Sequence, residues 1–589
     1  MKAITQILSE IVSEAFQKCG YDKALGFVTA SDRIDLCQFQ CNGAFDGAKL
    51  YRKAPFAIAN EIVAVLKENA VFAKAEAAHP GFINITLSDD YLLDVINQVS
   101  NDEKFGIPQA ENPETIIVDY GGPNVAKPLH IGHLRSAIIG ESLKRLARVS
   151  GNKVIGDVHL GDWGLQIGLV IAELEVRNPS WKCFDIRFKA DADTVPELEV
   201  DMLNEVYPFA SSKSKEDEEF KLKAQEATFE LQHGREGYIA LWKEILRVSI
   251  NDLKQNYANL NVDFDLWYGE SDAEQYVDGL IDTLNKKGLL RESDGAMVVD
   301  IAEEEDKAPM PPIIVKKTDN SNLYATTDLA TIVQREKDFN PDKIWYVVDS
   351  RQGFHFIQVF RCARKAQLVP ETTELEFLGF GTMNGSDGKP YKTRDGGVMR
   401  LSDLLDTATN EAQKKLNTST YLSTVSAEEK TVIARKVGIA AIKFGDLINH
   451  RSKDYIFDLD KFLSFEGKTG AYILYTITRI NSILKKVGTA YDTVLPMTYV
   501  YTDIERELIL KLILTGDVFS RAIEEKATNY ICENAYEIAA NFSSFYHESH
   551  VVDEADEAKK LFWVALIALT RKMLLMHLDV LGIDAVENM

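Results

Sequence analysis

The spacing of hydrophobic residues changes along the chain and marks segments of different secondary structure. A run of apolar, β-branched residues, Thr115–Val118, predicts a buried strand. A Gly/Pro/Asn-rich loop follows at 121–128, and apolar residues then recur at helical spacing over Ile131–Leu146. Lys153–Val158 predicts a second strand. The order strand, helix, strand predicts a parallel sheet, and its first loop should lie at the carboxyl edge, where α/β folds bind ligands.

The first 110 residues show a separate α/β pattern. Residues 1–20 have the periodicity of an amphipathic helix, Ile58–Asn69 is helical, and Phe82–Leu87 is a strand. The segment Gln38–Gly43 ends in Asn-Gly, which predicts a turn. We therefore expect an N-terminal α/β domain.

Two further patterns lie beyond the parallel-sheet segment. Ala190–Gly237 is rich in Glu and Lys, which is typical of a solvated insertion. Met297–Ile301 and Pro312–Lys316 predict two strands joined by an acidic loop. From about Val425 to the end the pattern is helical, and Gly and Pro are sparse, as in a helix bundle.

Two histidines make the loop edge a candidate site for a phosphate-bearing ligand. His130 and His133 are three residues apart at the start of the predicted helix, so their rings share one face. A helix start offers unpaired N–H groups and the positive end of the helix dipole. Gly132, which has no side chain, lets a base or ribose approach the backbone. These features suit a nucleoside triphosphate under attack at its α-phosphate, although two histidines at this spacing are also found as ordinary surface residues.

Composition predicts a soluble globular chain. Its 589 residues are 46% hydrophobic and 26% charged, and the length suggests about three or four domains. No apolar run predicts a membrane span, and residues 1–20 lack the basic start and apolar core of a signal peptide. We therefore expect a cytoplasmic protein with no membrane partner.

Net charge and cysteine usage limit the ligands that the chain can hold. A net charge of −24 predicts weak nonspecific affinity for nucleic acid, so RNA binding requires Lys and Arg to gather on one face. Of six cysteines only Cys37 and Cys41 are close, and no Cys or His follows them at zinc spacing. We expect reduced thiols and no structural zinc or other protein-bound metal.

The residues around His130 carry a more specific signal. The stretch Asp119–Ser136, DYGGPNVAKPLHIGHLRS, resembles the first signature of class I aminoacyl-tRNA synthetases, in the longer form of the arginyl-tRNA synthetase family. The sequence Gly-Asp-Trp-Gly at 161–164 adds to the match, and the resemblance runs nearly end to end. It implies ATP-dependent ligation of L-arginine to its tRNA through an arginyl-adenylate, in protein synthesis. The implied partners are tRNA, L-arginine and ATP with Mg²⁺, and the family is mostly monomeric.

The resemblance gives the expected domains their roles. The fold class is multidomain α/β: a Rossmann-like parallel-sheet catalytic domain with an insertion, an α/β N-terminal domain and an all-α C-terminal bundle. The expected divisions are 1–110 for the N-terminal tRNA-contacting domain, 111–400 for the catalytic domain with its insertion at about 190–300, 401–455 for a connecting helical region, and 456–589 for the helical anticodon-binding domain.

The resemblance also implies roles for individual residues. The expected catalytic residues are His130, His133 and Lys127. The expected ATP-binding residues are His130, Gly132, His133, Lys392 and Arg394. The expected arginine-binding residues are Asp119, Asn124, Tyr324, Asp328 and Gln352. In the N-terminal domain, Phe82 and Asn84 are expected to contact the outer corner of tRNA.

The chemistry of Tyr324 and Asp328 suits an arginine pocket, although the residues alone favour Asp328 as support for a helix N-terminus, and it is the resemblance that implies arginine binding. Tyr324 and Asp328 are four residues apart, so on a helix they project from one face. A guanidinium prefers a carboxylate, which accepts its planar fork of N–H donors, and a phenol adds a hydrogen bond or a stacking surface. Thr326 or Thr327 is expected to cap the start of this helix. His355, near the start of a later helix, is expected to be structural.

The second class I signature is irregular in this chain. The usual KMSKS is replaced by a Gly-rich, basic loop that contains Lys389, Lys392 and Arg394. In family members that depart in this way a lysine before the histidine motif is thought to compensate, and Lys127 occupies that place.

Three alternatives stay open at this point. Instead of an arginyl enzyme, the sequence would also fit a class I synthetase for another amino acid or a nucleotidyltransferase that shares only the histidine motif. The third alternative is a non-catalytic RNA-binding or scaffold protein on the same fold. The pair of Tyr324 and Asp328 favours arginine, the long helical C-terminus disfavours a nucleotidyltransferase, and the complete histidine motif with Lys127 disfavours a scaffold.

Overall fold

A four-stranded parallel sheet forms the centre of the molecule. The computed structural model describes residues 1–33, 35–316, 324–391, 399–417, 425–491 and 494–589. The order of the strands in the sheet is β11-β10-β5-β6. Their bounds are Thr115–Tyr120 (β5), Lys153–Asp157 (β6), Lys343–Val347 (β10) and Glu374–Phe377 (β11). The two strands expected at 115 and 153 are confirmed as parallel neighbours.

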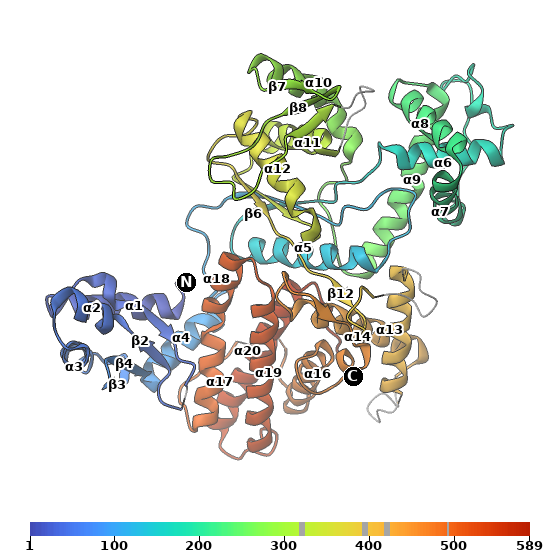
Figure 1. Cartoon of the computed structure of the whole chain (residues 1–589). Coiled ribbons are helices and arrows are strands. Elements are labelled where there is room, and N and C mark those ends of the chain that lie inside the picture. The colour runs from blue at the N-terminus through green and yellow to red at the C-terminus, as the bar shows by residue number, and fades with distance from the viewer. Residues whose placement is uncertain (34, 317–323, 392–398, 418–424, 492–493) are drawn as a thin grey trace.

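Helix α5, Ile131–Val149, connects β5 to β6 and is buried on nearly all sides. The helical spacing of its apolar residues predicted an amphipathic helix. Instead, the sheet covers one side and helices of the C-terminal region cover the other, so that α5 lies between the two halves of the molecule (Figure 1). Several of its buried polar residues are paired within the protein: Arg135 contacts the Asp446 carboxylate at 3.0 Å and donates to the Gly381 carbonyl.

The segment expected as an insertion is largely helical and projects to one side of the parallel sheet (Figure 1). After α6 (Leu165–Arg177) and the short η2 (Lys182–Phe184) it contains α7 (Val200–Glu216), α8 (Glu218–Gln232) and α9 (Glu236–Asn259). The chain then forms α10 (Glu270–Lys286) and an antiparallel sheet of β7 (Leu290–Ser293), β8 (Ala296–Val299) and β9 (Ile313–Lys316). The last two strands confirm the pair expected around the acidic loop. The domain is completed by α11 (Tyr324–Phe339), η3 (Ser350–Gln352) and α12 (Gly353–Lys365).

The N-terminal region packs helices on an antiparallel sheet of order β1-β2-β4-β3. Its elements are α1 (Ile4–Lys18), η1 (Lys23–Gly26), β1 (Val28–Ala30), β2 (Phe39–Cys41), α2 (Gly43–Tyr51), α3 (Pro55–Leu66), β3 (Phe72–Ala78), β4 (Phe82–Leu87) and α4 (Asp89–Asn101). The expected strand at 82–87 is confirmed. The turn expected at Asn42-Gly43 is wrong, because Asn42 is the residue at which α2 begins.

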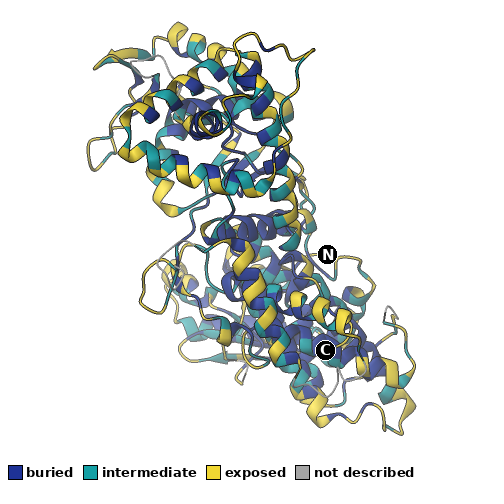
Figure 2. Ribbon diagram, turned by 90° about the vertical axis from the view of Figure 1, so that its right-hand side faces the viewer, coloured by how far each residue is buried: buried dark blue, intermediate teal, exposed yellow. Residues whose placement is uncertain are grey.

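Among the described residues from 383 onward, the chain is helical apart from a short parallel pair of strands, β12 (Met383–Asn384) with β13 (Tyr455–Ile456). The helices of this region are α13 (Leu401–Leu416), α14 (Ala427–Leu447), α15 (Leu459–Phe462), α16 (Gly470–Val487), α17 (Asp503–Ile513), α18 (Thr515–Glu525), α19 (Asn529–Glu548) and α20 (Glu557–Val580). Among the described residues, α20 is the one helix long and apolar enough to cross a membrane, contrary to the sequence expectation. It is mostly buried, and a central core helix has the same composition. Figure 2 shows that buried residues gather inside the molecule while exposed ones line its outside.

The N-terminal region is attached to the C-terminal helices by polar contacts. The Asp517 carboxylate accepts hydrogen bonds from the backbone N–H groups of Ile4 and Thr5, at 3.2 and 3.1 Å, and so caps α1. Arg506 on α17 binds the Asp89 carboxylate with two N–H donors at 2.7 and 2.8 Å. The first and last regions of the chain therefore lie side by side (Figure 1).

Replacing His577 by Gln should reduce the sensitivity of the melting temperature to acid. His577 in α20 is fully buried, and burial lowers its pKa from 6.5 to about 4. Below pH 6.5 the unfolded chain gains a proton that the folded chain takes up only near pH 4. This histidine therefore lowers the free energy of unfolding as pH falls through that window, by at most about 1.4 kcal/mol per pH unit. The Tm should fall more steeply from pH 7 to pH 5 in the parent than in His577→Gln.

Two buried carboxyl groups act in the opposite direction. Burial raises the pKa of Glu270 to about 7 and that of Asp162 to about 6, so the folded chain binds these protons first and gains stability as pH falls. Because both proteins contain these groups, the difference between their slopes isolates His577. Equal slopes would contradict the prediction.

Candidate active site

The two histidines at the start of α5 bind the backbone through the same ring atom. His130 is the N-cap residue, and its Nδ1 accepts a hydrogen bond from the Gly132 N–H at 3.0 Å. His133 Nδ1 accepts from the His130 N–H at 3.1 Å, and the ring centroids are 3.9 Å apart. Because each Nδ1 is an acceptor, each neutral ring carries its proton on Nε2. The pair therefore presents Nε2–H donors.

The expectation of unpaired N–H groups at this helix start is wrong. The histidine rings occupy the N–H groups of His130 and Gly132. The Ile131 N–H donates to the Met399 carbonyl at 3.0 Å, and the His133 N–H donates to the His130 carbonyl at 2.8 Å. The donors left for a phosphate at this helix start are the imidazole Nε2–H groups. Gly132 is needed here because a Cβ would lie 2.8 Å from His130 Cε1.

Burial keeps both imidazoles neutral. Burial, together with the positive charge of Lys127, lowers the pKa of His130 to about 4 and that of His133 to about 3. Lys127 is half-buried in the loop before the motif, and it is close enough to act on both rings. The arrangement thus combines one cation with two neutral donors, a set suited to charge on phosphate oxygens.

Asp328 and His355 form a polar pair between helices α11 and α12. Asp328 on α11 accepts a hydrogen bond from His355 Nε2 on α12, at 2.5 Å. His355 was expected to be structural. Its ring contacts Asp328, the residue expected to bind the guanidinium of arginine. Tyr324, one helical turn before Asp328, is 63% exposed. Both lie on α11, as expected from their spacing.

The two threonines expected to cap α11 do not cap it. Thr326 donates its hydroxyl to the Val315 carbonyl, and Thr327 donates to the Tyr324 carbonyl at 3.0 Å. Both lie inside the helix and are buried. They attach α11 to β9 and to its own first turn, and so they fix the helix that carries Asp328.

Asp119 already has a partner within the protein. It is next to Asp157 in the register of β5 and β6, and the Arg335 Nη2 donates to both carboxylates at 2.6 Å. Asp119, Asp157 and His159 together bring possible metal-ligand atoms within 4.8 Å of one another. Since the fully buried Arg335 guanidinium already binds an oxygen of each carboxylate, we assign no metal to this cluster.

Glu270 is a candidate site residue that the sequence reasoning missed. It is the first residue of α10, and burial with the nearby carboxylates Asp162 and Asp328 raises its pKa to about 7. Asp162 accepts hydrogen bonds from the Ser271 N–H and hydroxyl at 3.0 and 2.6 Å. Asp162 belongs to the Gly-Asp-Trp-Gly motif, which was the available signal that this loop lies at the site. The concentrated negative charge suits a cationic ligand.

The other predicted residues occupy separate positions. Asn124 lies over Gly161, where an added Cβ would come within 2.0 Å of its Oδ1. Gln352 is exposed at the start of α12. Phe82 and Asn84 lie on β4 of the N-terminal sheet: Phe82 packs edge-on against Phe45, and Asn84 accepts from Gln40. Lys392 and Arg394 lie outside the described residues.

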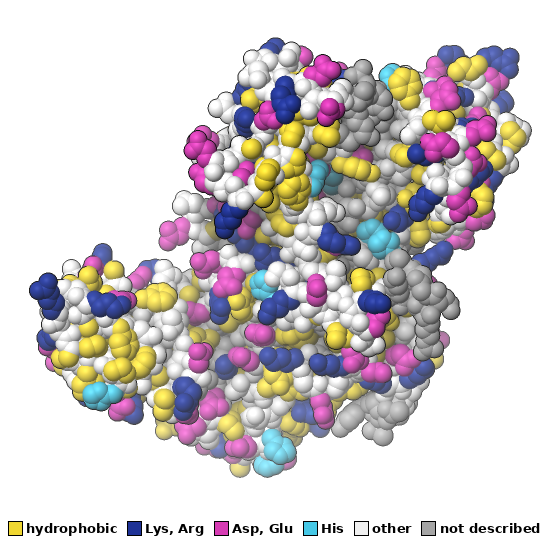
Figure 3. All heavy atoms as spheres, in the orientation of Figure 1, with side chains coloured by type: hydrophobic (Ala, Val, Ile, Leu, Met, Phe, Trp, Pro, Cys, Tyr) yellow, Lys and Arg dark blue, Asp and Glu magenta, His cyan; other side chains and the backbone are white. Residues whose placement is uncertain are grey.

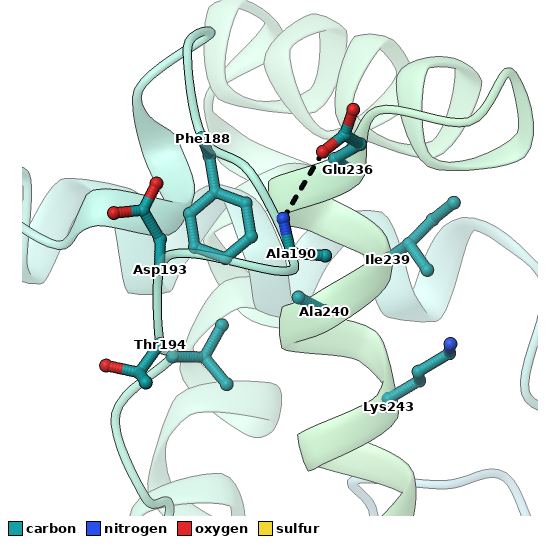
Figure 4. Close-up of a pocket in the computed structure, with 9 residues that line it drawn as sticks. Phe188, Ala190, Asp193, Thr194, Glu236, Ile239, Ala240 and Lys243 are labelled. Carbon is teal, nitrogen blue, oxygen red and sulfur yellow. Dashed lines mark hydrogen bonds between the residues drawn. The ribbon is translucent and has the colours of Figure 1, made fainter.

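A pocket of about 500 Å³ lies within the insertion and contains none of the predicted site residues (Figure 4). Its two acids are already occupied, because Glu236 binds Lys189 and the Ala190 N–H, and Asp193 binds Lys182. We assign it no ligand.

Comparison with known proteins identifies the family of the chain. The chain matches models of the class I (R) tRNA synthetase catalytic domain over residues 94–459, the DALR anticodon binding domain over 473–589 and the arginyl-tRNA synthetase N-terminal domain over 2–87. The arginine–tRNA ligases of Alkaliphilus oremlandii and Agathobacter rectalis are 50% and 48% identical to it, and each alignment covers the whole of both chains. The chain belongs to the arginyl-tRNA synthetase family.

Solved structures show the same architecture. The arginyl-tRNA synthetase from Plasmodium falciparum superposes with a TM-score of 0.82 at 25% identity, over the whole of both chains. The expected family and fold class are therefore confirmed. As an arginyl-tRNA synthetase the chain joins arginine to tRNA in an ATP-dependent reaction of protein synthesis, through the adenylate intermediate that is standard for the family.

Proposed function

We propose that His130, His133 and Lys127 stabilise the phosphates of ATP while the arginine carboxylate attacks the α-phosphorus. The observation that carries this assignment is the orientation of the two imidazoles, whose Nδ1 atoms are bound to the backbone. The reaction needs no side-chain nucleophile, so catalysis consists of positioning and charge stabilisation. Gly132 allows ATP to approach, and Lys392 and Arg394 add positive charge from the irregular second signature.

The acidic residues around Asp328 are proposed to bind arginine. Asp328 and Tyr324 contact the guanidinium, while Asn124 and Gln352 hold the amino-acid backbone. Asp119 contributes from β5, with its carboxylate oriented by Arg335. Burial, with the nearby carboxylates of Asp162 and Asp328, raises the pKa of Glu270 to about 7, and a bound guanidinium would balance the negative charge of this group.

Metal chemistry in this proposal belongs to the substrate. Mg²⁺ arrives with the ATP phosphates, as it prefers phosphate and water ligands to an all-protein site. We propose no structural zinc, because burial raises the pKa of Cys41 to about 11 and disfavours the thiolate that zinc binds.

The tRNA is proposed to contact the N-terminal, catalytic and anticodon-binding domains, within the four divisions given above. The C-terminal helices contact the anticodon, and Phe82 and Asn84 contact the outer corner. Acidic and basic side chains intermingle on the face shown in Figure 3, so affinity there would depend on individual cations rather than on one broad basic surface. We propose a cytoplasmic monomer without a membrane partner, since α20, the apolar helix, is mostly buried.

Adenylate formation is expected to depend on tRNA. Only a few synthetases share this requirement, and a bound partner that closes a loop over a site is a general way to complete a catalytic arrangement. ATP–pyrophosphate exchange with arginine should be slow in tRNA-free enzyme and rise strongly when cognate tRNA is added. Rapid exchange in rigorously tRNA-free enzyme would refute the requirement, and exchange with another amino acid in place of arginine would refute the assigned specificity.

A further inference from the structure

We infer that Ser249, on the insertion helix α9, is a positioning residue that sets the direction of Lys127. The inference rests on the proposed phosphate-stabilising role of Lys127. Helix α9 extends from the insertion to the start of α5 and so lies beside the loop that leads into the histidine motif (Figure 1).

The loop before the motif is held on two sides. On one side its backbone pairs with Gly161: the Val125 N–H donates to the Gly161 carbonyl at 3.0 Å, and the Gly161 N–H donates to the Pro123 carbonyl at 3.1 Å. On the other side the Ala126 N–H donates to the Ser249 hydroxyl oxygen at 3.0 Å. Ser249 is 6% exposed and Ala126 4%, so water does not compete for this hydrogen bond.

Ala126 has an unfavourable backbone conformation that this contact helps to maintain. Its φ is +61°, in the left-handed region that residues with a Cβ seldom occupy. Without the Ser249 hydroxyl, the buried N–H would lose its acceptor in a residue that already prefers another conformation. The loop would then be expected to relax.

The next residue has little freedom of its own. Lys127 precedes Pro128, whose ring confines the Lys127 backbone to extended conformations. The direction of the lysine side chain therefore depends on Ala126. The space between the loop and helices α7 and α9 is only about 10 Å³, so Leu203 and Leu253 leave the loop little room to shift toward them.

The positive charge of Lys127 reaches both His130 and His133, as its effect on their pKa values shows. A small rotation at Ala126 would move this charge relative to the two Nε2–H donors. The hydrogen bond from the Ala126 N–H to Ser249 of the insertion thus keeps the Lys127 ammonium group in place relative to the two imidazoles.

A double-mutant cycle tests the inference. Lys127→Ala should slow tRNA-supported ATP–pyrophosphate exchange by roughly 10²-fold, as the loss of one charge-stabilising group does. Ser249→Ala should slow it roughly 10-fold in the parent, with the KM for arginine unchanged, but by less than about twofold in the Lys127→Ala background. A group that acts through Lys127 has nothing left to position when the lysine is absent.

Two further variants separate positioning from folding. Ala126→Gly should restore part of the rate lost in Ser249→Ala, because glycine adopts the left-handed conformation without help. Ser142→Ala is the matched control: Ser142 is buried in α5 and its hydroxyl has no hydrogen-bond partner among the described residues, so exchange should stay at the parent level.

The possible failures are distinguishable. If Lys127→Ala exchanges normally, the proposed role of Lys127 fails and the inference fails with it. If Lys127→Ala is slow but Ser249→Ala is normal, or loses the same factor in both backgrounds, the inference alone is overturned. A rate loss that Ala126→Gly does not restore and that follows a fall in Tm would also overturn it.

Discussion

Replacing His133 by Ala is expected to slow arginyl-adenylate formation by roughly 10²- to 10³-fold, the cost of losing one donor that stabilises charge in a transition state. Burial and the charge of Lys127 hold the pKa of His133 near 3, so at neutral pH the ring acts as a neutral donor through Nε2. The KM for arginine should change little, because Asp328 lies on a different helix, α11. Exchange kinetics with tRNA present measure both quantities.

Two amide variants distinguish catalysis from capping. The His133 Nδ1 accepts from the His130 N–H, so alanine removes a cap as well as a donor. Asn places its amide group near the position of Nδ1, and can keep the cap while losing the Nε2–H. Gln reaches the position of Nε2 and can keep a donor there. We expect His133→Asn to be as slow as His133→Ala, and His133→Gln to retain more activity. If Asn instead restores the rate, His133 acts as a cap and not as a phosphate ligand.

Sequence patterns predicted the elements whose cause is local. The strands at 115–120 and 153–157 and helix α5 follow from runs of apolar residues and from helical spacing, which report burial directly. The turn predicted at Asn42-Gly43 was wrong because the same residue types favour both turns and helix starts. Here Asn42 is the N-cap residue of α2. The helix cap predicted at the threonines of α11 was wrong for a similar reason: a hydroxyl can accept a hydrogen bond at a cap or donate one within the helix.

Contacts between distant segments were outside the reach of those patterns. Asp119 was predicted as a ligand for arginine, but the sequence contains no signal that Arg335, 216 residues later, would lie between it and Asp157. The pairing of Asp328 with His355 likewise depends on how α11 and α12 pack. The N–H groups at the start of α5 were expected to be unpaired, but the two histidines and Met399 supply acceptors for them.

Replacing Asp328 by Asn tests the arginine pocket. This change keeps the size of the side chain but removes its charge, and it turns one acceptor oxygen into a donor that faces the guanidinium N–H groups. Loss of one partner of a hydrogen-bonded charge pair costs about 2–5 kcal/mol, much of it from the unpaired charge that remains. We expect kcat/KM for arginine to fall on the order of 10²-fold or more. The KM for ATP should hardly move, because the triphosphate is assigned to His130 and His133.

Citrulline makes the test specific, because it is a neutral analogue of arginine. Asp328→Asn should discriminate against citrulline less strongly than the parent, since the carboxylate no longer favours the cation. His355→Ala is the matched variant: it removes the partner at 2.5 Å but leaves the carboxylate, so preference for arginine should persist even if the rate falls. If Asp328 serves only to join α11 to α12, both variants should lower the Tm and neither should change the arginine/citrulline ratio of kcat/KM. An unchanged ratio in Asp328→Asn would therefore remove Asp328 from the arginine pocket, whereas a changed ratio in that variant alone assigns guanidinium recognition to its charge.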